Sequence, residues 1–386
     1  MQPFDFRTTP ALIAGAGRLA ELGRIFSDLK ATRIGLVTDP GILSAGLAEG
    51  ALAALREKGL TVEVWSDVSA DPPEAQILAA VDGLRRAGVD AILGLGGGSP
   101  MDTAKLVALL LGTDQPIAEA YGVGQARGTR MPLVLVPTTA GTGSEVTPIA
   151  IVTTGENEKK GVVAPQLYPD AAILDATLTT GLPASVTAAT GIDAMVHAIE
   201  AYTSRHRKNP MSDALAREAL ARLGGSIRTA CTVPDDLEAR GEMLLGACLA
   251  GMAFANAPVA AVHALAYPLG GHFKVPHGLS NAMVLPAVLA FNRAEPSAEA
   301  AYAELAPIVF PALAGHDAGL RVDGFIEELG ALGPELGLET RLSSVGVAEE
   351  HVERLAEDAL KQTRLLVNNP REMTLDAARE IYRDAI

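Results

Sequence analysis

Short aliphatic runs alternate with helical stretches along roughly the first half of the chain. The runs that read as strands are Arg33–Thr38, Thr61–Trp65, Ala91–Leu95, Met131–Val136, Ile149–Thr154 and Ala171–Leu174. The stretches between them that read as helices are Leu43–Glu57, Glu74–Ala87 and Pro100–Leu111. Along most of these strands apolar and polar residues do not alternate, so both faces of the sheet should be buried. The alternation of strands with helices therefore predicts an α/β fold whose largely parallel sheet is covered on both faces.

Beyond Pro183 the strand pattern fades and long stretches rich in Ala, Leu and Glu take over. The expected helices are Ala188–Thr203, Ser212–Arg222, Leu237–Ala255, Val322–Leu332, Glu349–Lys361 and Leu375–Ala385. Ser212 is a candidate N-cap, and Gly224-Gly225 is a candidate helix end. We therefore predict two domains, an α/β domain over 1–182 and an all-helical domain over 183–386.

The chain has 386 residues, with 31 Lys and Arg against 46 Asp and Glu, so its formal charge is −15. A net negative charge disfavours nucleic acid or an anionic membrane surface as the main partner. The two cysteines, Cys231 and Cys248, cannot form a disulfide framework and suggest a reducing compartment. The N-terminus shows no secretory pattern, and the longest aliphatic run, Leu106–Leu111, is too short to span a membrane, so we expect a cytoplasmic protein.

A glycine-rich loop, GLGGGSPMD at 94–102, ends one predicted strand and opens a helix. Consecutive glycines let the backbone approach an anion, and the helix N-terminus adds favourable partial charge. Ser99 can cap this helix, and Pro100 suits its first turn. An ordinary tight turn is the plainer alternative, although the strand-to-helix context favours an anion site. No Gly-Lys-Ser/Thr follows, so this is not a phosphate loop of that kind.

A second loop, PTTAGTGSE at 137–145, is rich in hydroxyl groups and follows another strand. Its alternative is a solvated turn, but two such loops at the carboxyl ends of parallel strands favour one shared ligand. Asp39, which ends the first strand, can bond a ribose diol and would repel a 2′-phosphate, or it can simply form the turn before Pro40. It precedes the glycines, whereas the usual dinucleotide fingerprint places its acidic residue about 20 residues after them.

Three histidines and an aspartate form a candidate metal site on the helical half. Asp193 and His197 are four residues apart and share a helix face, while His263 and His277 lie in later stretches of small residues. Imidazoles with one carboxylate suit a divalent transition metal better than calcium or magnesium. Each residue has a plainer reading, a helix-surface pair or a core histidine, but burying several histidines without a ligand is costly.

Taken together, these motifs resemble those of the iron-containing alcohol dehydrogenase family, also called group III. The matching stretches are GLGGGSPMDTAK (94–105), PTTAGTGSEVT (137–147), PDAAILDATLTTGLP (169–183), ATGIDAMVHAIEAYTS (189–204), HALAYPLGGHFKVPHGLSNA (263–282) and NNPREMT (368–374). The resemblance covers essentially the whole chain. It implies a dinucleotide-binding α/β domain, then an all-helical domain, with the active site in a cleft, and a homodimer.

The resemblance also implies the cofactors and the reaction. The expected metal ligands are Asp193, His197, His263 and His277, for Fe²⁺ first and Zn²⁺ second. The residues expected to hold NAD are Asp39, Gly96, Gly97, Gly98, Ser99, Asp102, Thr138, Thr139, Thr142 and Lys160. The implied reaction is reversible hydride transfer between NAD and a small-molecule alcohol, or the corresponding aldehyde or ketone.

Tyr267 departs from the family pattern, because many members have a histidine there that is linked to proton relay. Its hydroxyl can relay a proton or orient a group, although an ordinary tyrosine pKa near 10 makes a poor base. His272 is the alternative relay residue, and it can equally face solvent. Phe254 and Ile149 are candidate substrate contacts that favour an apolar alcohol, the plainer reading being that they belong to the core.

A second function remains open from the residues themselves. A metal- and NAD-dependent lyase acting on a sugar phosphate, like the related dehydroquinate synthases, would use a similar cofactor pair. Such an enzyme needs several Lys or Arg side chains near the metal ligands, and Lys274 alone is obvious there. We therefore rank the dehydrogenase first.

Overall fold

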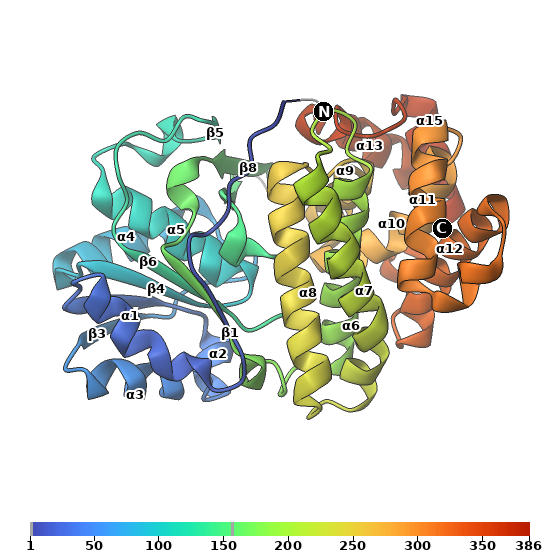
Figure 1. Cartoon of the computed structure of the whole chain (residues 1–386). Helices are drawn as coiled ribbons and strands as arrows, with labels where there is room; N and C mark the ends of the chain where they lie inside the picture. The colour runs from blue at the N-terminus through green and yellow to red at the C-terminus, as the bar shows by residue number, and fades with distance from the viewer. Residues whose placement is uncertain (1–2, 156–157) are drawn as a thin grey trace. The chain divides into compact units, whose positions relative to one another are not determined.

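The structure, a computed structural model, describes residues 3–155 and 158–386, which divide into two units. The first unit is Thr8–Gly181, and the second is Leu182–Ile386 together with the N-terminal residues up to Arg7. The Arg7 backbone and the Asn256 side chain exchange two hydrogen bonds of 2.8 and 2.9 Å. These bonds explain why the N-terminal segment belongs with the second unit. Figure 1 colours the chain along its length.

A parallel sheet of six strands forms the centre of the first unit (Figure 1). In sheet order the strands are β1 (Leu12–Ala14), β9 (Ala171–Leu174), β6 (Leu133–Pro137), β4 (Ala91–Gly96), β2 (Arg33–Val37) and β3 (Thr61–Trp65). The chain runs outward from β2 to β3 and then returns to place β4 on the other side of β2. The direction of winding therefore reverses between β2 and β4, and ligands of open α/β sheets bind outside the carboxyl ends of strands at such a point.

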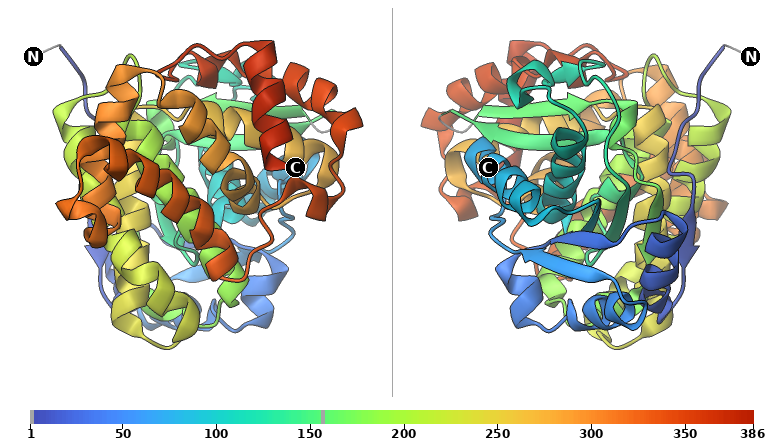
Figure 2. Two further views of the ribbon diagram at one scale, coloured as in Figure 1. Left: turned by 90° about the vertical axis from the view of Figure 1, so that its right-hand side faces the viewer. Right: turned by 90° about the vertical axis from the view of Figure 1, so that its left-hand side faces the viewer.

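Both faces of this sheet are buried, as the apolar strands predict. In β6, Leu133 and Leu135 join one core cluster with residues of α4 (Glu74–Ala87) and α5 (Gly98–Gly112). The alternate residues Val134 and Val136 join a second cluster with α1 (Leu22–Asp28) and α3 (Glu49–Glu57). The right-hand view of Figure 2 faces this unit. Successive side chains point to opposite faces, so an all-apolar strand needs helices on both.

One local prediction for this unit is wrong, and one predicted strand belongs to a second sheet that was not expected. The strand Ile149–Thr154 forms as expected (β7), but it pairs antiparallel with β8 (Glu158–Val163), which pairs parallel with β5 (Gly122–Val123), in a separate three-stranded sheet. The expected helix Leu43–Glu57 is two helices, α2 (Pro40–Ser44) and α3. Gly46 between them has φ +70°, a conformation that ends the first helix.

Helices make up the second unit, which faces the viewer in the left-hand view of Figure 2. They are α6 (Ala184–Tyr202), α7 (Pro210–Thr232), α8 (Leu237–Asn256), α9 (Ala261–Phe273), α10 (His277–Asn292), α11 (Pro296–Val309), α12 (Ala318–Glu335), α13 (Glu349–Leu360), α14 (Thr363–Leu366) and α15 (Leu375–Ala385). The α/β class with a following helical region is thus as predicted.

Helix α7 is longer at both ends than expected. Asn209, not Ser212, is the N-cap, and its Oδ1 accepts from the backbone NH groups of Met211 and Ser212. Gly224 lies inside the helix, and a Cβ there would approach the carbonyl oxygen of Val309 to 3.0 Å. The glycine therefore permits close packing of α7 against the end of α11 and does not terminate the helix.

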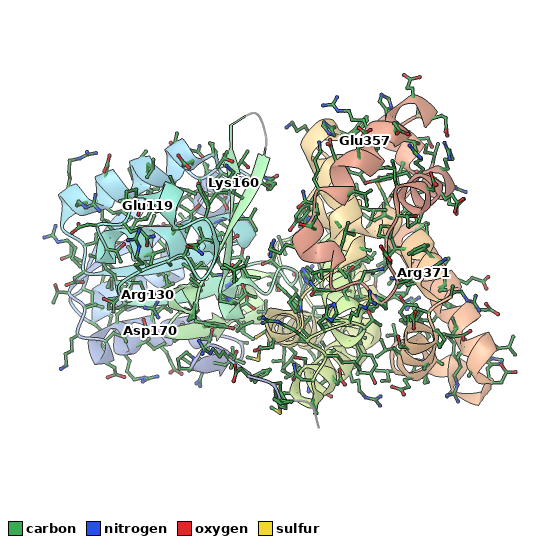
Figure 3. All side chains as sticks on the ribbon, turned by 90° about the horizontal axis from the view of Figure 1, so that it is seen from above. Glu119, Arg130, Lys160, Asp170, Glu357 and Arg371 are labelled. Atoms are coloured by element: carbon green, nitrogen blue, oxygen red, sulfur yellow. The ribbon has the colours of Figure 1, made fainter. Side chains whose placement is uncertain are left out.

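Charged side chains labelled in Figure 3 fix individual segments within each unit. Arg130 forms an ion pair of 2.7 Å with Asp170, and the same carboxylate accepts from the backbone NH of Leu133, which ties together the starts of β6 and β9. Arg371 lies over the ring of Phe291 in the helical unit, 4.0 Å from its centroid.

Among residues 3–155 and 158–386, no helix alone combines the length and the apolar character that crossing a membrane requires. Helices α8 and α9 meet that test when taken together, across a bend of 106°.

Candidate metal centre and nucleotide loops

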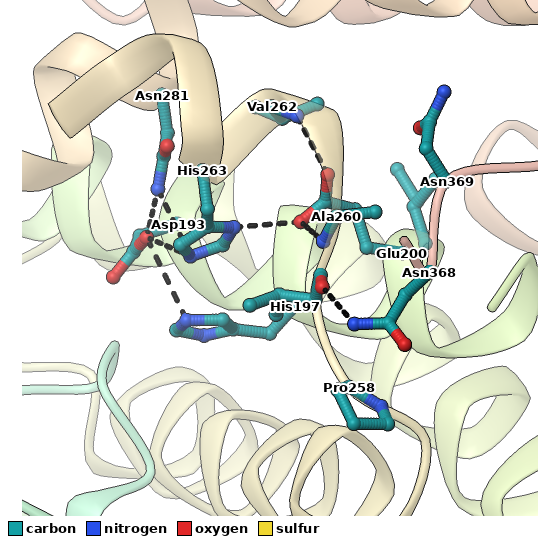
Figure 4. Close-up of polar contacts among 12 residues, drawn as sticks. Asp193, His197, Glu200, Pro258, Ala260, Val262, His263, Asn281, Asn368 and Asn369 are labelled. Carbon is teal, nitrogen blue, oxygen red and sulfur yellow. Dashed lines mark hydrogen bonds and ion pairs between the residues drawn. The ribbon is translucent and has the colours of Figure 1, made fainter. Parts of the chain in front are cut away.

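Three helices of the second unit supply the four predicted metal ligands. Asp193 and His197 lie one turn apart on α6, His263 lies in the first turn of α9, and His277 is the first residue of α10. Their candidate ligand atoms all lie within 4.8 Å of one another. Asp193 Oδ1 is 3.9, 3.8 and 3.6 Å from Nε2 of His197, His263 and His277, and Figure 4 shows the carboxylate beside the first two.

This donor set fits a divalent transition metal. Three imidazole nitrogens and one carboxylate oxygen, at separations near 4 Å, can surround an ion that binds each at about 2.0–2.2 Å. Asp193, His197 and His263 are buried, whereas 43% of the His277 side chain is exposed. Three of the four candidate ligands are therefore withdrawn from solvent, and His277 is the exposed member of the cluster.

Electrostatics within the cluster favour an ionised carboxylate. Burial by itself would raise the pKa of Asp193, but the three imidazoles and a hydrogen bond from Asn281 outweigh burial and hold that pKa below its ordinary value. The carboxylate is thus in the form that binds a cation.

Asn281 is a contact that the sequence analysis missed. Its Nδ2 donates to Asp193 Oδ1 at 2.6 Å and lies 3.3 Å from Nε2 of His263. Asn281 follows His277 by one helical turn on α10, so spacing would have placed both on one face. Gly278 permits this approach, because a Cβ there would lie 2.3 Å from the carbonyl oxygen of Ala189 on α6.

The two candidate relay residues lie in different surroundings on α9. The ring centroid of Tyr267 is 6.0 Å from that of the candidate ligand His277. Nε2 of His272 lies 2.6 Å from a carboxylate oxygen of Asp358 on α13. The structure therefore brings Tyr267 to the cluster, while His272 takes part in an ion-pair arrangement at the surface.

In the first unit, the glycine loop and the hydroxyl-rich loop lie side by side. The backbone NH of Thr138 donates to the carbonyl of Gly96 at 3.0 Å. A Cβ at Gly97 would lie 3.6 Å from Thr139 Oγ1, and one at Gly98 would lie 3.0 Å from Thr142 Cγ2. The two loops follow the adjacent parallel strands β4 and β6, which explains their proximity.

Glycine is required at position 96. This residue has φ +149°, and a Cβ there would lie 2.7 Å from Pro100 Cγ. The cap prediction for this loop is wrong, because α5 begins at Gly98 with Gly97 as its N-cap. The hydroxyl of Ser99 instead accepts from the backbone NH of Asp71 at 3.2 Å.

The predicted acidic contacts of the nucleotide have protein partners of their own. Asp39 caps α2, with Oδ1 accepting from the backbone NH of Ile42, and its Oδ2 is 3.5 Å from the position of a Cβ on Gly96. Asp39 follows β2 and Gly96 ends β4, so both flank the point where the sheet reverses its winding. Asp102 accepts from Ser144 Oγ and from the backbone NH of Ile151, and it braces the hydroxyl-rich loop.

Lys160 and Ile149 lie on the small sheet of the first unit. Lys160, on β8, has its Nζ 5.8 Å from the ring centroid of Tyr121. Ile149 begins β7 and is partly buried, and its carbonyl accepts from Nζ of Lys105. Phe254, the other candidate substrate contact, lies on α8 of the second unit with its ring stacked on His197.

Lys105 is a second residue that the sequence analysis missed. Its ammonium is fully buried and donates to Ser144 Oγ, Thr147 Oγ1 and the carbonyl of Ile149 at 2.7, 3.1 and 2.7 Å. Burial lowers the pKa of Lys105 to about 8, although the nearby carboxylates of Asp102 and Glu145 oppose that shift. A lysine at the end of the glycine motif was the available signal.

Comparisons with known proteins agree with this geometry. Residues 9–176 match the family model described as iron-containing alcohol dehydrogenase, and residues 187–386 match that of the Fe-containing alcohol dehydrogenase family, C-terminal. The chain is 39% identical to long-chain-alcohol dehydrogenase 1 of Geobacillus thermodenitrificans (strain NG80-2), over 97% of this chain and 95% of that protein.

Solved structures are similar along the full length. A crystal structure of 1,3-propanediol oxidoreductase superposes with a TM-score of 0.96 at 32% identity, covering 100% of both chains. Sulfoacetaldehyde reductase from Bifidobacterium kashiwanohense, solved in complex with NAD⁺, superposes with a TM-score of 0.88 at 28% identity, covering 100% of this chain and 99% of that one.

Proposed function

This chain belongs to the iron-containing alcohol dehydrogenase family, whose reaction is NAD-linked interconversion of an alcohol with its aldehyde or ketone, and we propose which of its residues carry that reaction out. Asp193, His197, His263 and His277 hold the metal ion, with Fe²⁺ as the resident ion and Zn²⁺ as the alternative. The observation that carries this assignment is the convergence of one carboxylate and three imidazoles from three helices. A bound divalent ion supplies Lewis acidity, which lowers the pKa of an alcohol hydroxyl.

The loops at the carboxyl ends of β4 and β6 bind NAD. Backbone NH groups at the start of α5 face the pyrophosphate, and the glycines allow it to approach. Asp39, on the other side of the winding reversal, accepts from the ribose diol and selects NAD over NADP. The remaining proposed contacts are Ser99, Asp102, Thr138, Thr139, Thr142 and Lys160.

The substrate is a small alcohol or aldehyde with an apolar chain. Phe254 supports this choice, since its ring lies against the metal ligand His197 and presents no hydrogen-bonding group. Ile149 is the second apolar contact that we propose. Tyr267 is the relay or orienting residue, supported by its position next to His277. The lyase alternative is not favoured, because the matching family models and the relatives above are those of dehydrogenases and reductases.

We also propose a cytoplasmic homodimer that binds neither nucleic acid nor membrane. The acidic composition and the two free cysteines support the location and the absence of anionic partners. The dimer rests on family resemblance, and light scattering of the purified protein tests it.

The decisive experiment combines metal analysis with a panel of alcohols. The freshly purified protein should contain about one iron or zinc per chain, and NADH should form from primary alcohols only when the metal is present. Apolar alcohols should be better substrates than glycerol. A His263→Ala variant should still bind NAD⁺ but bind the metal far more weakly and lose activity. Turnover of a sugar phosphate without net NADH formation would support the lyase instead.

A further inference from the structure

Glu200 is a buried carboxylate on α6 that lies on the same face as two metal ligands. Asp193, His197 and Glu200 are spaced at i, i+4 and i+7, so each lies about one helical turn from the last. Only 5% of the Glu200 side chain is exposed. A buried carboxylate is costly unless hydrogen bonds compensate for its lost hydration, so its partners indicate why it is there.

The carboxylate of Glu200 has three polar contacts at the start of α9. Oε2 accepts from the backbone NH of Ala260 at 2.9 Å, and Oε1 accepts from the backbone NH of Val262 at 2.7 Å. Oε2 also lies 2.7 Å from Nδ1 of His263. Figure 4 shows these three contacts converging on the carboxylate. The N-cap residue of α9, Ala260, has no side chain that can accept a hydrogen bond from the first turn. The carboxylate of Glu200, on α6, accepts these hydrogen bonds instead.

The bond to Nδ1 determines which nitrogen of His263 faces the cluster. A carboxylate accepts only, so Nδ1 must carry the hydrogen, and Nε2 points to Asp193 at 3.8 Å. Carboxylates that hold the far nitrogen of a metal-binding histidine fix its tautomer and ring orientation.

The C-terminal motif NNP holds the same turn from the other side. Nδ2 of the buried Asn368 donates to the carbonyl of Val259 at 3.2 Å. The carbonyl of Asn368 in turn accepts from the backbone NH of Arg205 at 2.8 Å. The residues just before α9 are therefore fixed by a carboxylate on one side and an amide on the other.

We propose that Glu200 is the positioning residue of the metal centre, which together with Asn368 fixes the start of α9 so that His263 presents Nε2 to the ion. This inference rests on the proposed metal site. Glu200 is not a ligand of the ion and does not contact the substrate. Its contribution is to the affinity and geometry of metal binding.

Glu200→Gln tests this with little change of volume. One oxygen becomes an NH₂ group, which would face a backbone NH or the Nδ1 hydrogen, so two donors would meet. We expect the affinity of the metal-free protein for Zn²⁺, measured by chelator competition, to fall about 10- to 100-fold. The absorption spectrum of the Co²⁺-loaded variant should shift as well. Glu304→Gln is the control for the loss of charge alone, because Glu304 is an exposed carboxylate on α11 that accepts from the hydroxyl of Tyr202 on α6.

A double-variant cycle separates positioning from general destabilisation. In a His263→Ala background, Glu200→Gln should not weaken Zn²⁺ binding further. NAD⁺ binding and far-ultraviolet circular dichroism of the single variant should match the wild type. Unchanged Zn²⁺ affinity in folded Glu200→Gln would overturn the proposal. If the wild type itself bound no metal, the proposed metal site would fail instead.

A measurement on the wild type covers the case in which Glu200→Gln does not fold. In the Zn²⁺-loaded protein, nitrogen-15 spectroscopy of the histidine rings should show the hydrogen of His263 on Nδ1. A hydrogen on Nε2, with the metal on Nδ1, would contradict the assignment.

Discussion

The ring of Phe254 stacks on the imidazole of His197, with centroids 4.4 Å apart and planes inclined by 24°. Phe254 is 8% exposed, so its ring is held within the helical unit rather than at the surface. The stack restrains the plane of a metal ligand, and it also places an apolar surface beside the cluster. Phe254 therefore links the geometry of the proposed metal site with the proposed preference for an apolar substrate.

Phe254→Leu separates these two roles from simple core packing. An aromatic pair contributes about 0.5–1.5 kcal/mol. Loss of the stack should therefore weaken Zn²⁺ binding by about two- to tenfold. KM for an apolar alcohol should rise more than KM for ethanol. Steady-state kinetics and chelator competition measure both quantities. Phe325→Leu is the control, because Phe325 is a buried ring that contacts Tyr302 and not His197. If the two variants changed Zn²⁺ affinity and KM equally, Phe254 would act only as a core packing residue.

Gly96→Ala should damage NAD binding. The added methyl group would meet Pro100 at 2.7 Å in a backbone conformation that L residues rarely adopt, so the start of α5 must move. We expect the Kd for NAD⁺ to rise about tenfold or more, since a shift of this loop loses charge-assisted backbone contacts. Fluorescence titration with NAD⁺ measures the change.

Gly46→Ala is the matched control for the glycine prediction. Gly46 also has a positive φ (+70°), but a Cβ added there would meet nothing within 4 Å. The substitution should lower the free energy of unfolding by about 1 kcal/mol and leave the Kd for NAD⁺ unchanged. Wild-type affinity in Gly96→Ala would argue against the glycine loop as the nucleotide site.

Strands were predictable where their apolar character is continuous, and less so elsewhere. β4 and β6 are buried on both faces, and their continuous runs of apolar residues predict this burial. β8 was missed because its sequence, EKKGVV, is polar at the start and becomes a strand through pairing with β7. The break between α2 and α3, and the continuity of α7 through Gly224, depend on contacts that no local pattern contains.

Among the functional residues too, some could be predicted from local sequence and others depend on contacts between distant segments. The convergence of the four candidate metal ligands could be predicted from the family resemblance together with the spacing of Asp193 and His197. Glu200 and Asn281 continue the same helical faces, so their spacing was visible, but glutamate and asparagine on a helix are common. Only the tertiary contacts of Glu200 with α9 distinguish it. The roles of Lys105 and Asn368 depend on backbone carbonyls far away in the sequence.

If the Tyr267 hydroxyl takes part in proton transfer, Tyr267→Phe should lower kcat about 100-fold. This is the lower end of the rate contribution of a general acid or base. Its position beside His277 is the reason for this expectation. The Kd for Zn²⁺ should be unaffected, and the pH profile of kcat should lose a limb. His272→Gln is the comparison, because His272 pairs with Asp358. It should keep wild-type kcat and lose less than about 1 kcal/mol of stability. The reverse pattern would assign the relay to His272.

Lys105 joins α5, which follows the glycine loop, to the hydroxyl-rich loop. Its three hydrogen bonds reach Ser144, Thr147 and Ile149, so one ammonium holds the loop and the start of β7 against the helix. The ammonium is fully buried, and burial lowers the pKa of Lys105 from its ordinary 10.5 to about 8. Protonation of this amine is therefore less favourable in the folded chain than in the unfolded chain.

Comparison with Lys105→Met converts this shift into a pH dependence of stability. Above about pH 10.5 the Lys105 amine is neutral in both the folded and the unfolded chain. Below about pH 8 it is charged in both, and burial of the charged amine then lowers the free energy of unfolding by about 3 kcal/mol. Between these values the unfolded chain binds more protons, and stability rises with pH. The free energy of unfolding of the wild type minus that of Lys105→Met should increase by about 2 kcal/mol from pH 7 to pH 9.5. Urea denaturation at each pH measures it, with Lys58→Met giving the change for an exposed lysine. A difference that stays flat or falls with rising pH would show that Lys105 remains charged in the folded protein.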